Sequence, residues 1–326
     1  MQLRAAVTLG ATGRYAAQAT QARAGLELWA EQDGIDLDVR DDQGSPGVAL
    51  AAYRDFLEGD ADILLGPYAS GLVRRVVDTV CRTHRLLWNH GGSADDLARP
   101  GLVSVLAPAS SYLRPLVQLG RRRGVESAVL LRGSGRFAAQ VIDGARREAD
   151  AMGLPARVVD LGSWQAPDSL ARQAALIAGT FEEDVDAVRR LRGAGVDVAL
   201  LGCVAAGIRE FGARLGALSE GVLAPVQWAG GDRPVTVGPT AKGFARDFEH
   251  RTGMAPDYPA AQAAATGWLA AEATRRGIGV EDMTRWRTTT LLGPFELDPA
   301  WRQVGYTPSV IQWREGGFET LHRNWS

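Results

Sequence analysis

The sequence is poor in lysine and cysteine, and it lacks long hydrophobic runs. Lys242 is its only lysine, and all other basic residues apart from histidine are arginines. The two cysteines, Cys81 and Cys203, lie far apart and do not show the C-x-x-C type of spacing that metal sites use. No stretch of about 18 consecutive apolar residues is present, which argues against a membrane-spanning helix. We therefore expect no metal, no cofactor and no transmembrane segment.

An excess of positive charge is also missing, because the formal net charge is -2. Proteins that bind nucleic acids usually present a basic surface to the phosphates. We therefore expect no nucleic-acid partner. Hydrophobic residues make up 46% of the chain and charged residues 23%, which is typical of a globular protein.

The chain is long for a single hydrophobic core, since 326 residues usually divide into two domains. Short β-like runs alternate with longer helical patterns, which predicts parallel sheets covered by helices on both faces. A strand is expected at 5–9, almost at the start of the sequence, with no signal peptide before it. Two interpretations follow: such a segment was removed from an exported protein, or the protein is cytoplasmic.

Two consecutive strand-to-helix turns between residues 61 and 97 are the strongest candidates for a site. The first strand, Ile63 to Leu65, is followed by Gly66, Pro67, Tyr68, Ala69 and Ser70, and the second, Leu86 to Trp88, by Asn89, His90, Gly91, Gly92 and Ser93. In an open parallel sheet, ligands bind outside the carboxyl ends of the strands. These two neighbouring loops therefore predict a ligand cradle.

The two serines have two interpretations. Ser70 stands before apolar residues at i, i+3, i+4 and i+7 spacing, and Ser93 before a short helix, so each is placed to act as an N-cap. The start of a helix can also hold an anionic or carbonyl oxygen of a ligand. Local sequence leaves capping alone and ligand contact both open.

Other residues near these loops have similar alternatives. Arg14 can pair with a carboxylate and Tyr15 can stack on a ligand, or both can simply cover the end of a helix. Asn89 and His90 can contact a ligand or satisfy the backbone of their own loop.

An ordered series of segments resembles a known family. The segments are LLGPYASG, LLWNHGGSADDL, RGSGRFAAQVIDGARREADAMG, TGMAPDYPAAQAAATGWLAAEA and GPFELDPAWRQVGYTPSVIQW. Together they resemble the type I periplasmic binding proteins, and within them the branched-chain amino acid (leucine/isoleucine/valine) and amide-binding branch of ABC-transporter substrate-binding proteins. The resemblance covers nearly the whole chain in the same order.

The resemblance implies an α/β fold of two doubly wound parallel-sheet lobes joined by a three-segment hinge. We expect lobe 1 to comprise residues 1–108 and 236–307, and lobe 2 to comprise residues 109–235 and 308–326. A late strand at 308–313 then completes the second sheet. Closure of the lobes around a small molecule would exclude water.

The resemblance also implies ligand contacts, position by position. The loop of Tyr68 and Ala69 supplies Ser70, and the next loop supplies Gly91 and Ser93, which together hold a carboxylate and part of an ammonium group. An aromatic residue of the second lobe falls on Phe137.

Two positions depart from the family pattern. A second-lobe tyrosine typical of the family falls near Val204, and the ammonium-binding glutamate of the family falls near Gly231 or Asp232. If Asp232 takes the acidic role, an amino acid ligand remains possible, and if it only forms a turn, the ligand need not be a cation.

The predicted function is a non-enzymatic, extracytoplasmic solute receptor that delivers a small carboxylate- or amide-bearing molecule, amino acid-like or aromatic, to an ABC permease. The alternative is a cytoplasmic amide or small-ligand sensor that controls a regulatory partner. We expect a monomer. A Ser-His-Asp arrangement is left open by the sequence, but no G-x-S-x-G elbow is present, and catalysis is the weaker class.

Overall fold

The computed structural model describes residues 2–13, 15–167, 169–231 and 233–321. The chain forms two compact units and passes between them three times, after residues 107, 229 and 306. Unit 1 comprises Met1–Ala107 and Gly230–Tyr306, and unit 2 comprises Pro108–Ala229 and Thr307–Ser326. That these units act as closing lobes remains a proposal.

Unit 1 is built around a five-stranded parallel sheet in the order β2-β1-β3-β4-β5. Its first segment contains β1 Arg4–Thr8, α1 Ala16–Asp33, β2 Asp36–Arg40, α2 Pro46–Glu58, β3 Ile63–Leu65, α3 Ser70–Cys81, β4 Leu87–Asn89, the 3-10 helix η1 Asp95–Leu97 and β5 Leu102–Ser104. The second segment adds α8 Ala241–Thr252, α9 Tyr258–Arg276, α10 Val280–Met283, β11 Arg287–Thr290 and β12 Gly293–Glu296.

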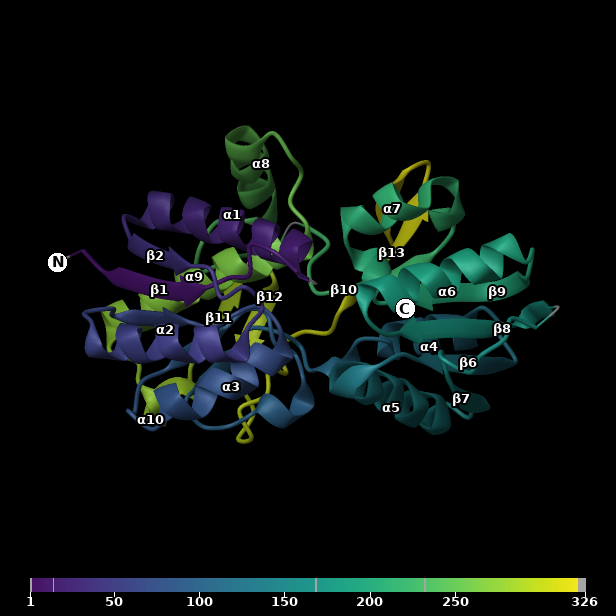
Figure 1. The fold of residues 1–326 in the computed structure, drawn as a ribbon, viewed down its shortest axis with the longest axis horizontal. Helices are drawn as coiled ribbons and strands as arrows, with labels where there is room; N and C mark the ends of the chain where they lie inside the picture. The colour runs from purple at the N-terminus through teal and green to yellow at the C-terminus, as the bar shows by residue number, and fades with distance from the viewer. Residues whose placement is uncertain (1, 14, 168, 232, 322–326) are drawn as a thin grey trace. The chain divides into compact units, whose positions relative to one another are not determined.

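Helices cover both faces of this sheet (Figure 1). On one face, α2 and α3 pack their buried sides onto the strands, with Tyr53 and Phe56 from α2 and the predicted valine stripe from α3. On the other face, α1 packs along α9. Pro46 starts α2, since proline fits the first turn of a helix, and the preceding Ser45 caps it.

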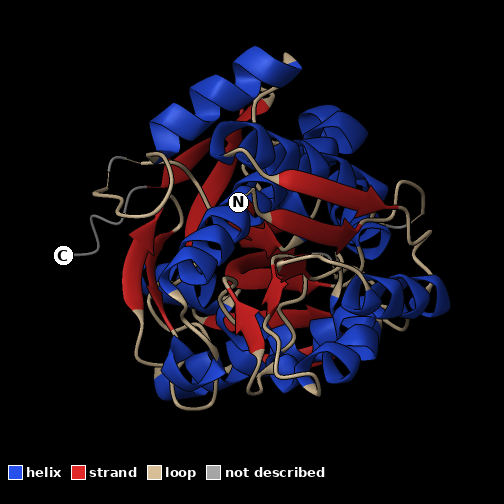
Figure 2. Ribbon diagram, turned by 90° about the vertical axis from the view of Figure 1, so that its left-hand side faces the viewer, coloured by secondary structure: helices blue, strands red, loops and turns tan. Residues whose placement is uncertain are grey.

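Unit 2 is built around a seven-stranded sheet in the order β14-β13-β10-β9-β8-β6-β7. Its elements are the 3-10 helix η2 Ala109–Ser111, α4 Arg114–Arg122, β6 Ser127–Arg132, α5 Gly135–Ala151, β7 Ala156–Asp160, β8 Ser169–Ala178, α6 Phe181–Gly193, β9 Asp197–Cys203, η3 Ala205–Gly207, α7 Arg209–Leu215, η4 Gly216–Ser219, β10 Leu223–Val226, β13 Ser309–Arg314 and β14 Gly317–Leu321. Figure 2 shows the helices around the strands in a second view.

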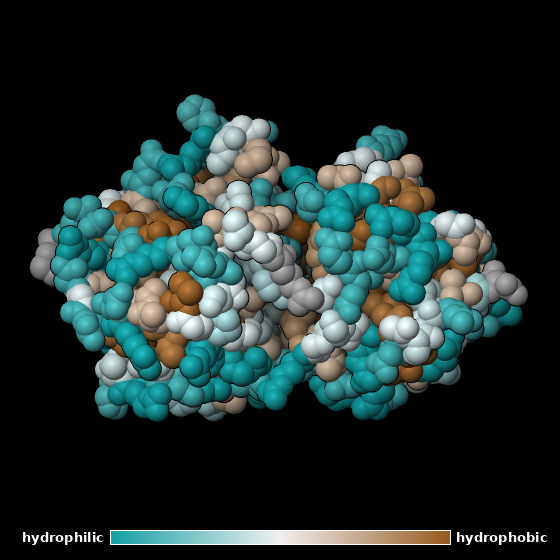
Figure 3. Space-filling model, in the orientation of Figure 1, coloured by the Kyte–Doolittle hydropathy of each residue, from teal (hydrophilic) through white to brown (hydrophobic). Residues whose placement is uncertain are grey.

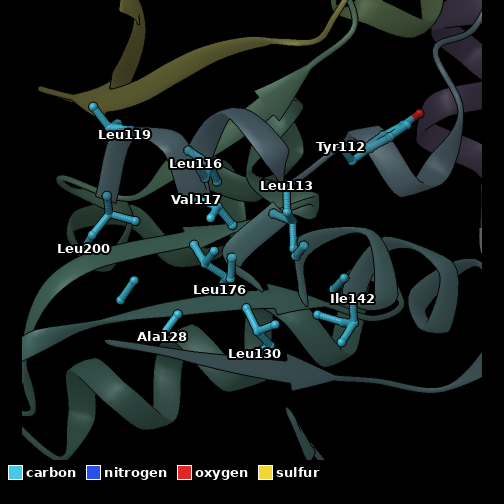
Figure 4. Packing of buried hydrophobic residues seen from close by; sticks show 14 of the residues in the cluster. Tyr112, Leu113, Leu116, Val117, Leu119, Ala128, Leu130, Ile142, Leu176 and Leu200 are labelled. Atoms are coloured by element: carbon cyan, nitrogen blue, oxygen red, sulfur yellow. The ribbon is translucent and has the colours of Figure 1, made fainter. Parts of the chain in front are cut away.

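The core beneath the second sheet explains how unit 2 is held together. Figure 4 shows Leu113, Leu116 and Val117 pointing from α4 and the turn before it toward Leu130 and Leu176 of the central strands. All five side chains are buried. Burying a leucine or valine side chain stabilises a fold by about 1.5–3 kcal/mol, so this cluster fixes α4 firmly on the sheet.

The predicted α/β fold of two doubly wound sheets is confirmed, with three corrections. The second sheet is mixed, because β13 pairs antiparallel with β10 and β14 pairs antiparallel with β13. Strand β8 and the antiparallel hairpin of β11 and β12 were not predicted. The sequence pattern of residues 110–123 suggests one helix, but the structure divides this segment into η2 and α4, since Pro115 has no N–H group and is confined to the first turn of α4. The late strand does complete the second sheet, as predicted.

Hydrophilic residues predominate over each unit on the face drawn in Figure 3, and hydrophobic residues form only small groups there. No helix within the described part of the chain is long and apolar enough to span a membrane.

Candidate functional site

The strand order of the first sheet contains a topological switch point. Strand order reverses between β1 and β3, since the chain goes from β1 outward to β2 and then back past β1 to β3. Ligands of open α/β sheets bind at such a switch point, outside the carboxyl ends of the strands. The loops at this point are 9–15, after β1, and 66–69, after β3.

Two tyrosines meet at this switch point. The rings of Tyr15 and Tyr68 lie 6.0 Å apart, centroid to centroid, and are tilted by 51°. Tyr15 is 41% exposed, whereas Tyr68 is only 8% exposed and also packs against the ring of His90 at 6.2 Å. The arrangement leaves the Tyr15 ring accessible to a ligand while Tyr68 forms the base beneath it.

Hydrogen bonds join the two predicted loops into one surface. The Gly66 amide donates to the Trp88 carbonyl at 2.7 Å, and the Ala69 amide donates to the Gly91 carbonyl at 3.2 Å. The Ala94 amide donates to the Ser70 hydroxyl oxygen at 3.1 Å. The loops after β3 and β4 are therefore brought together, as the sequence predicted.

The capping role considered for Ser70 is wrong. Ala69 occupies the N-cap position of α3, and no side-chain capping bond is made there. The half-buried Ser70 hydroxyl instead accepts from Ala94, on the neighbouring loop. A hydroxyl carries one hydrogen and two lone pairs, so this bond occupies an oxygen lone pair and leaves the O–H group to donate. Ser70 is thus prepared to bind an acceptor such as a carboxylate or carbonyl oxygen.

Ser93 is not a cap either, because Ala94 precedes η1 and makes no side-chain capping bond. Ser93 is 8% exposed as a whole residue, and its Oγ atom is not among the described side-chain atoms that are buried without a hydrogen-bond partner. A hydroxyl that water can reach can exchange that water for a ligand oxygen.

The backbone at Ala69 is strained. Its φ of 96° and ψ of 137° lie in a region that residues with a side chain rarely adopt. Such strain costs about 1–3 kcal/mol and is most often found at binding or catalytic sites. The strained residue lies where the loop after β3 meets the start of α3.

Gly91 permits the close contact between the loops. A Cβ atom at this position would lie 2.7 Å from the Cα atom of Tyr68 and 2.8 Å from its ring. Any side chain here would push the two loops apart, so Gly91 acts through the backbone.

Asn89 and His90 are both fully buried. The Asn89 carboxamide accepts from the Gly91 and Gly92 amides at 3.2 and 2.8 Å and donates to the Gly92 carbonyl and the Ser104 hydroxyl. Asn89 therefore satisfies its own loop, which is the second of the two interpretations that the sequence left open.

His90 has an unusual environment for a polar ring. Neither ring nitrogen has a hydrogen-bond partner among the described residues. Burial lowers the pKa of His90 to about 4, and the nearby Gly66 backbone offsets this only weakly. His90 is thus neutral near pH 7, and it forms no hydrogen bond with Ser70 in this structure. The described residues do not assemble a Ser-His pair.

The corresponding edge of unit 2 is more apolar. Phe137, in the first turn of α5, packs edge-on against Tyr112 with ring centroids 5.5 Å apart. Val204 follows β9 and is half-buried. Both side chains pack on the core of unit 2, and part of each remains accessible. Arg14 and Asp232 lie outside the described residues.

Sequence reasoning did not single out the first turn of α6, where Glu183 joins the loops after β6 and β8. The available signal was the T-x-x-E pattern of Thr180 and Glu183, which predicts a capping box. Without strand β8, that pattern could not be placed at the edge of the sheet.

A groove of about 180 Å³ in unit 1 lies away from these loops. It is lined mainly by residues at the amino ends of β1 and β2 and near the end of α2. Arg4 pairs there with Asp36 and Asp60, and Arg40 with Asp55. The paired charges leave little to recognise a ligand. Within the described ranges, no group of His, Cys, Asp and Glu side chains is arranged to hold a metal ion.

The family model described as periplasmic binding protein matches residues 2–292. A search of curated proteins found no significant match.

Solved structures with the same fold are similar over nearly their full length. A leucine-binding protein, LivK, from Thermotoga maritima has a TM-score of 0.83 and 15% identity, with 98% of each chain covered. LivJ from Streptococcus pneumoniae, a branched-chain amino acid transporter substrate-binding protein in complex with isoleucine, has a TM-score of 0.82 and 15% identity, with 98% of this chain and 99% of LivJ covered. An ABC-transporter solute-binding protein from R. palustris, in complex with benzoate, has a TM-score of 0.74 and 16% identity, with 98% of this chain and 96% of that chain covered.

Proposed function

Because the chain belongs to the periplasmic binding protein family, a family of binding proteins and not of enzymes, we propose that it is the extracytoplasmic solute receptor of an ABC importer. In this proposal, it captures a small organic molecule with a carboxylate or amide group between two closing lobes and presents it to the permease.

The observation that carries the proposal is the pair of serine hydroxyls on the linked loops of unit 1. The Ser70 hydroxyl accepts from the Ala94 amide and can still donate a hydrogen bond, and the Oγ atom of Ser93 is not among the buried atoms that lack a partner in the described part of the chain. Two available hydroxyls beside the start of a helix match the needs of an anionic or carbonyl oxygen. We infer that Ser70, Ser93 and the Gly91 backbone hold the polar head of the ligand.

Tyr15 and Tyr68 extend this surface on the side of the switch point. Phe137 and Val204 supply apolar surface at the corresponding edge of unit 2. A few converging polar groups with apolar walls are the usual design of a small-molecule site. We therefore propose a ligand with an apolar aliphatic or aromatic body. Asn89 is not proposed as one of its contacts, because its carboxamide is fully engaged in other hydrogen bonds.

The complexes of similar structures suggest two ligand classes to test. LivJ is in complex with isoleucine, and the R. palustris protein is in complex with benzoate. The first has an ammonium group and the second has none. If Asp232 supplies the acidic partner, amino acids should bind better than aromatic acids, and otherwise the order should be reversed.

A melting-temperature screen with L-leucine, L-isoleucine, benzoate, benzamide and urea tests the proposal. A ligand present at 100 times its Kd stabilises the folded protein by about 2.7 kcal/mol, which gives a clear rise in Tm. We expect at least one carboxylate or amide to raise Tm in a concentration-dependent way. If none of these solutes shifts Tm at millimolar concentration, the proposed ligand classes are wrong.

A further inference from the structure

The second sheet has its own switch point, and an acidic pair lies there. Strand order reverses between β6 and β8, since β7 lies on one side of β6 and β8 on the other. The loops at this point are 133–134, before α5, and 179–180, before α6. Glu183 and Asp184 follow in the first turn of α6.

Glu183 connects the two loops of the switch point. Its carboxylate accepts from the Ser134 amide, with both oxygens at 3.1 Å, and from the Thr180 amide at 2.7 Å. The Thr180 bond belongs to the capping box of α6, but the Ser134 bond reaches 49 residues back along the chain. These hydrogen bonds hold the pKa of Glu183 below its usual range, although partial burial opposes them.

The two loops are in close contact at Glu183. A Cβ atom on Gly133 would lie 2.5 Å from the Gly179 Cα atom and 2.7 Å from a Glu183 carboxylate oxygen. The backbone of the β6 loop is thus pressed against both the other loop and the carboxylate. Phe137 lies one helical turn after this contact.

Asp184 connects the same helix to a third loop. It is fully buried, and its Oδ2 atom accepts from the Ala205 amide at 2.9 Å, directly after Val204. Its Oδ1 atom has no hydrogen-bond partner of normal geometry among the described residues. Burial raises the pKa of Asp184 to about 7, and the backbone amides of the adjoining loops offset part of that rise.

Burying a carboxyl group in this way costs free energy that a surface cap would not. A serine or threonine suffices to cap a helix, and Thr180 already caps α6. The acidic pair therefore does more than start the helix: it ties the loop before Phe137 and the loop of Val204 to one rigid element.

We propose that Glu183 and Asp184 are positioning residues. They hold the loop before α5, which carries Phe137, and the loop of Val204 in the arrangement that receives the apolar body of the ligand. This inference rests on the proposed function. Neither carboxylate is assigned to touch the ligand, and each acts through the loop that it binds.

The first test measures loop order without any ligand. Amide hydrogen exchange is compared in the wild-type protein and in Glu183→Asp, Glu183→Ala and Asp184→Asn, with Glu182→Gln as the matched control. Glu182 is exposed in the same helical turn and pairs with Arg214. Glu183→Asp keeps the negative charge but is one methylene shorter, so it should fail to reach Ser134.

Both Glu183 variants should increase exchange at Ser134 about tenfold, which corresponds to the loss of one hydrogen bond, and should leave Ala205 unchanged. Asp184→Asn retains a carbonyl oxygen for Ala205, so a smaller increase is expected there. The control should leave both sites within about twofold of wild type. Unchanged exchange at Ser134 in both Glu183 variants would overturn the proposal, whether or not a ligand has been found.

The second test measures the Kd of L-isoleucine and of benzoate by calorimetry. For the probe that binds wild type, Glu183→Asp should raise the Kd about tenfold. The Tm of the variant should stay within a few degrees of that of wild type. Faster Ser134 exchange with an unchanged Kd would show that the Glu183 hydrogen bonds serve only the fold of unit 2, and it would overturn their role in binding. If neither probe binds wild type, the proposed ligand classes fail, and the exchange result still decides whether Glu183 orders the loop of Ser134.

Discussion

Ser70 and Ser93 should affect binding alike and stability differently. In Ser70→Ala the Ala94 amide loses its acceptor, and Ala94 is buried. An unsatisfied buried N–H group costs about 1–3 kcal/mol, and a water molecule that accepts from it reduces this cost. We therefore expect Ser70→Ala to lower the free energy of unfolding by about 1–2 kcal/mol. Ser93→Ala removes no hydrogen bond made by the described residues, and its stability should stay within about 0.5 kcal/mol of wild type.

Ligand affinity should fall in both variants. A hydrogen bond to a charged group contributes about 1.5–3 kcal/mol, which is roughly a 10- to 150-fold change in Kd. Urea denaturation gives the stability of each variant, and calorimetry with the best solute from the screen gives its Kd.

The matched control is Thr240→Ala, which removes the N-cap of α8, where the Gly243 amide donates to the threonine hydroxyl at 3.1 Å. It should cost about 1 kcal/mol of stability without changing Kd. The reasoning is refuted if Ser93→Ala binds as tightly as wild type, or if Thr240→Ala loses as much affinity as Ser70→Ala.

Three further substitutions test the loop surface. The pKa of His90 is lowered to about 4, so the folded state binds fewer protons than the unfolded state, and its contribution is lost as pH falls from about 6.5 to 4. In wild type, the free energy of unfolding should therefore fall by at most about 3 kcal/mol over this pH range because of His90. His90→Leu should lack this pH-dependent fall, which urea unfolding of both proteins at each pH measures. Ala69→Gly relieves the strain at φ 96°, so the free energy of unfolding should stay unchanged or rise by up to about 1 kcal/mol. At an unstrained position the same change would lower it. A clear loss of stability in urea unfolding would contradict the strain argument. Gly91→Ala places a Cβ atom 2.7 Å from the Cα atom of Tyr68 and should cost about 1–3 kcal/mol of stability, measured by urea unfolding. It should also reduce ligand affinity, measured by calorimetry. Wild-type affinity in this variant would show that ligand binding does not need the close contact between the loops.

The sequence carries clear information about the first unit. Strand β3 and the valine stripe of α3 lie where the pattern predicted them, because hydrophobic periodicity directly reflects burial on a sheet. Strand β8 was not predicted, since its sequence SLARQAALIA is rich in alanine and its first half contains the exposed Ser169 and Arg172. Without β8, the switch point of the second sheet and the role of Glu183 could not be located.

Local sequence cannot identify distant hydrogen-bond partners. Ser70 looks like a capping residue because it precedes a helical pattern, yet its partner is the Ala94 amide, 24 residues away. Asn89 ends β4 and His90 follows it, and both are buried. Asn89 uses its hydrogen-bonding atoms on the following loop and on Ser104 of β5, whereas the ring of His90 has no partner among the described residues. Only the packing of unit 1 determines this difference.

The most direct test of the proposed receptor site is amide hydrogen exchange with and without the solute that gives the largest rise in Tm. We predict that a saturating concentration slows exchange in two segments of unit 1, residues 66–73 and 89–97, which contain Ser70 and Ser93. Slower exchange in these segments is the expected effect of a ligand bound to their backbone and hydroxyl groups. Protection confined to other parts of the chain, with both segments exchanging as in the free protein, would contradict the site.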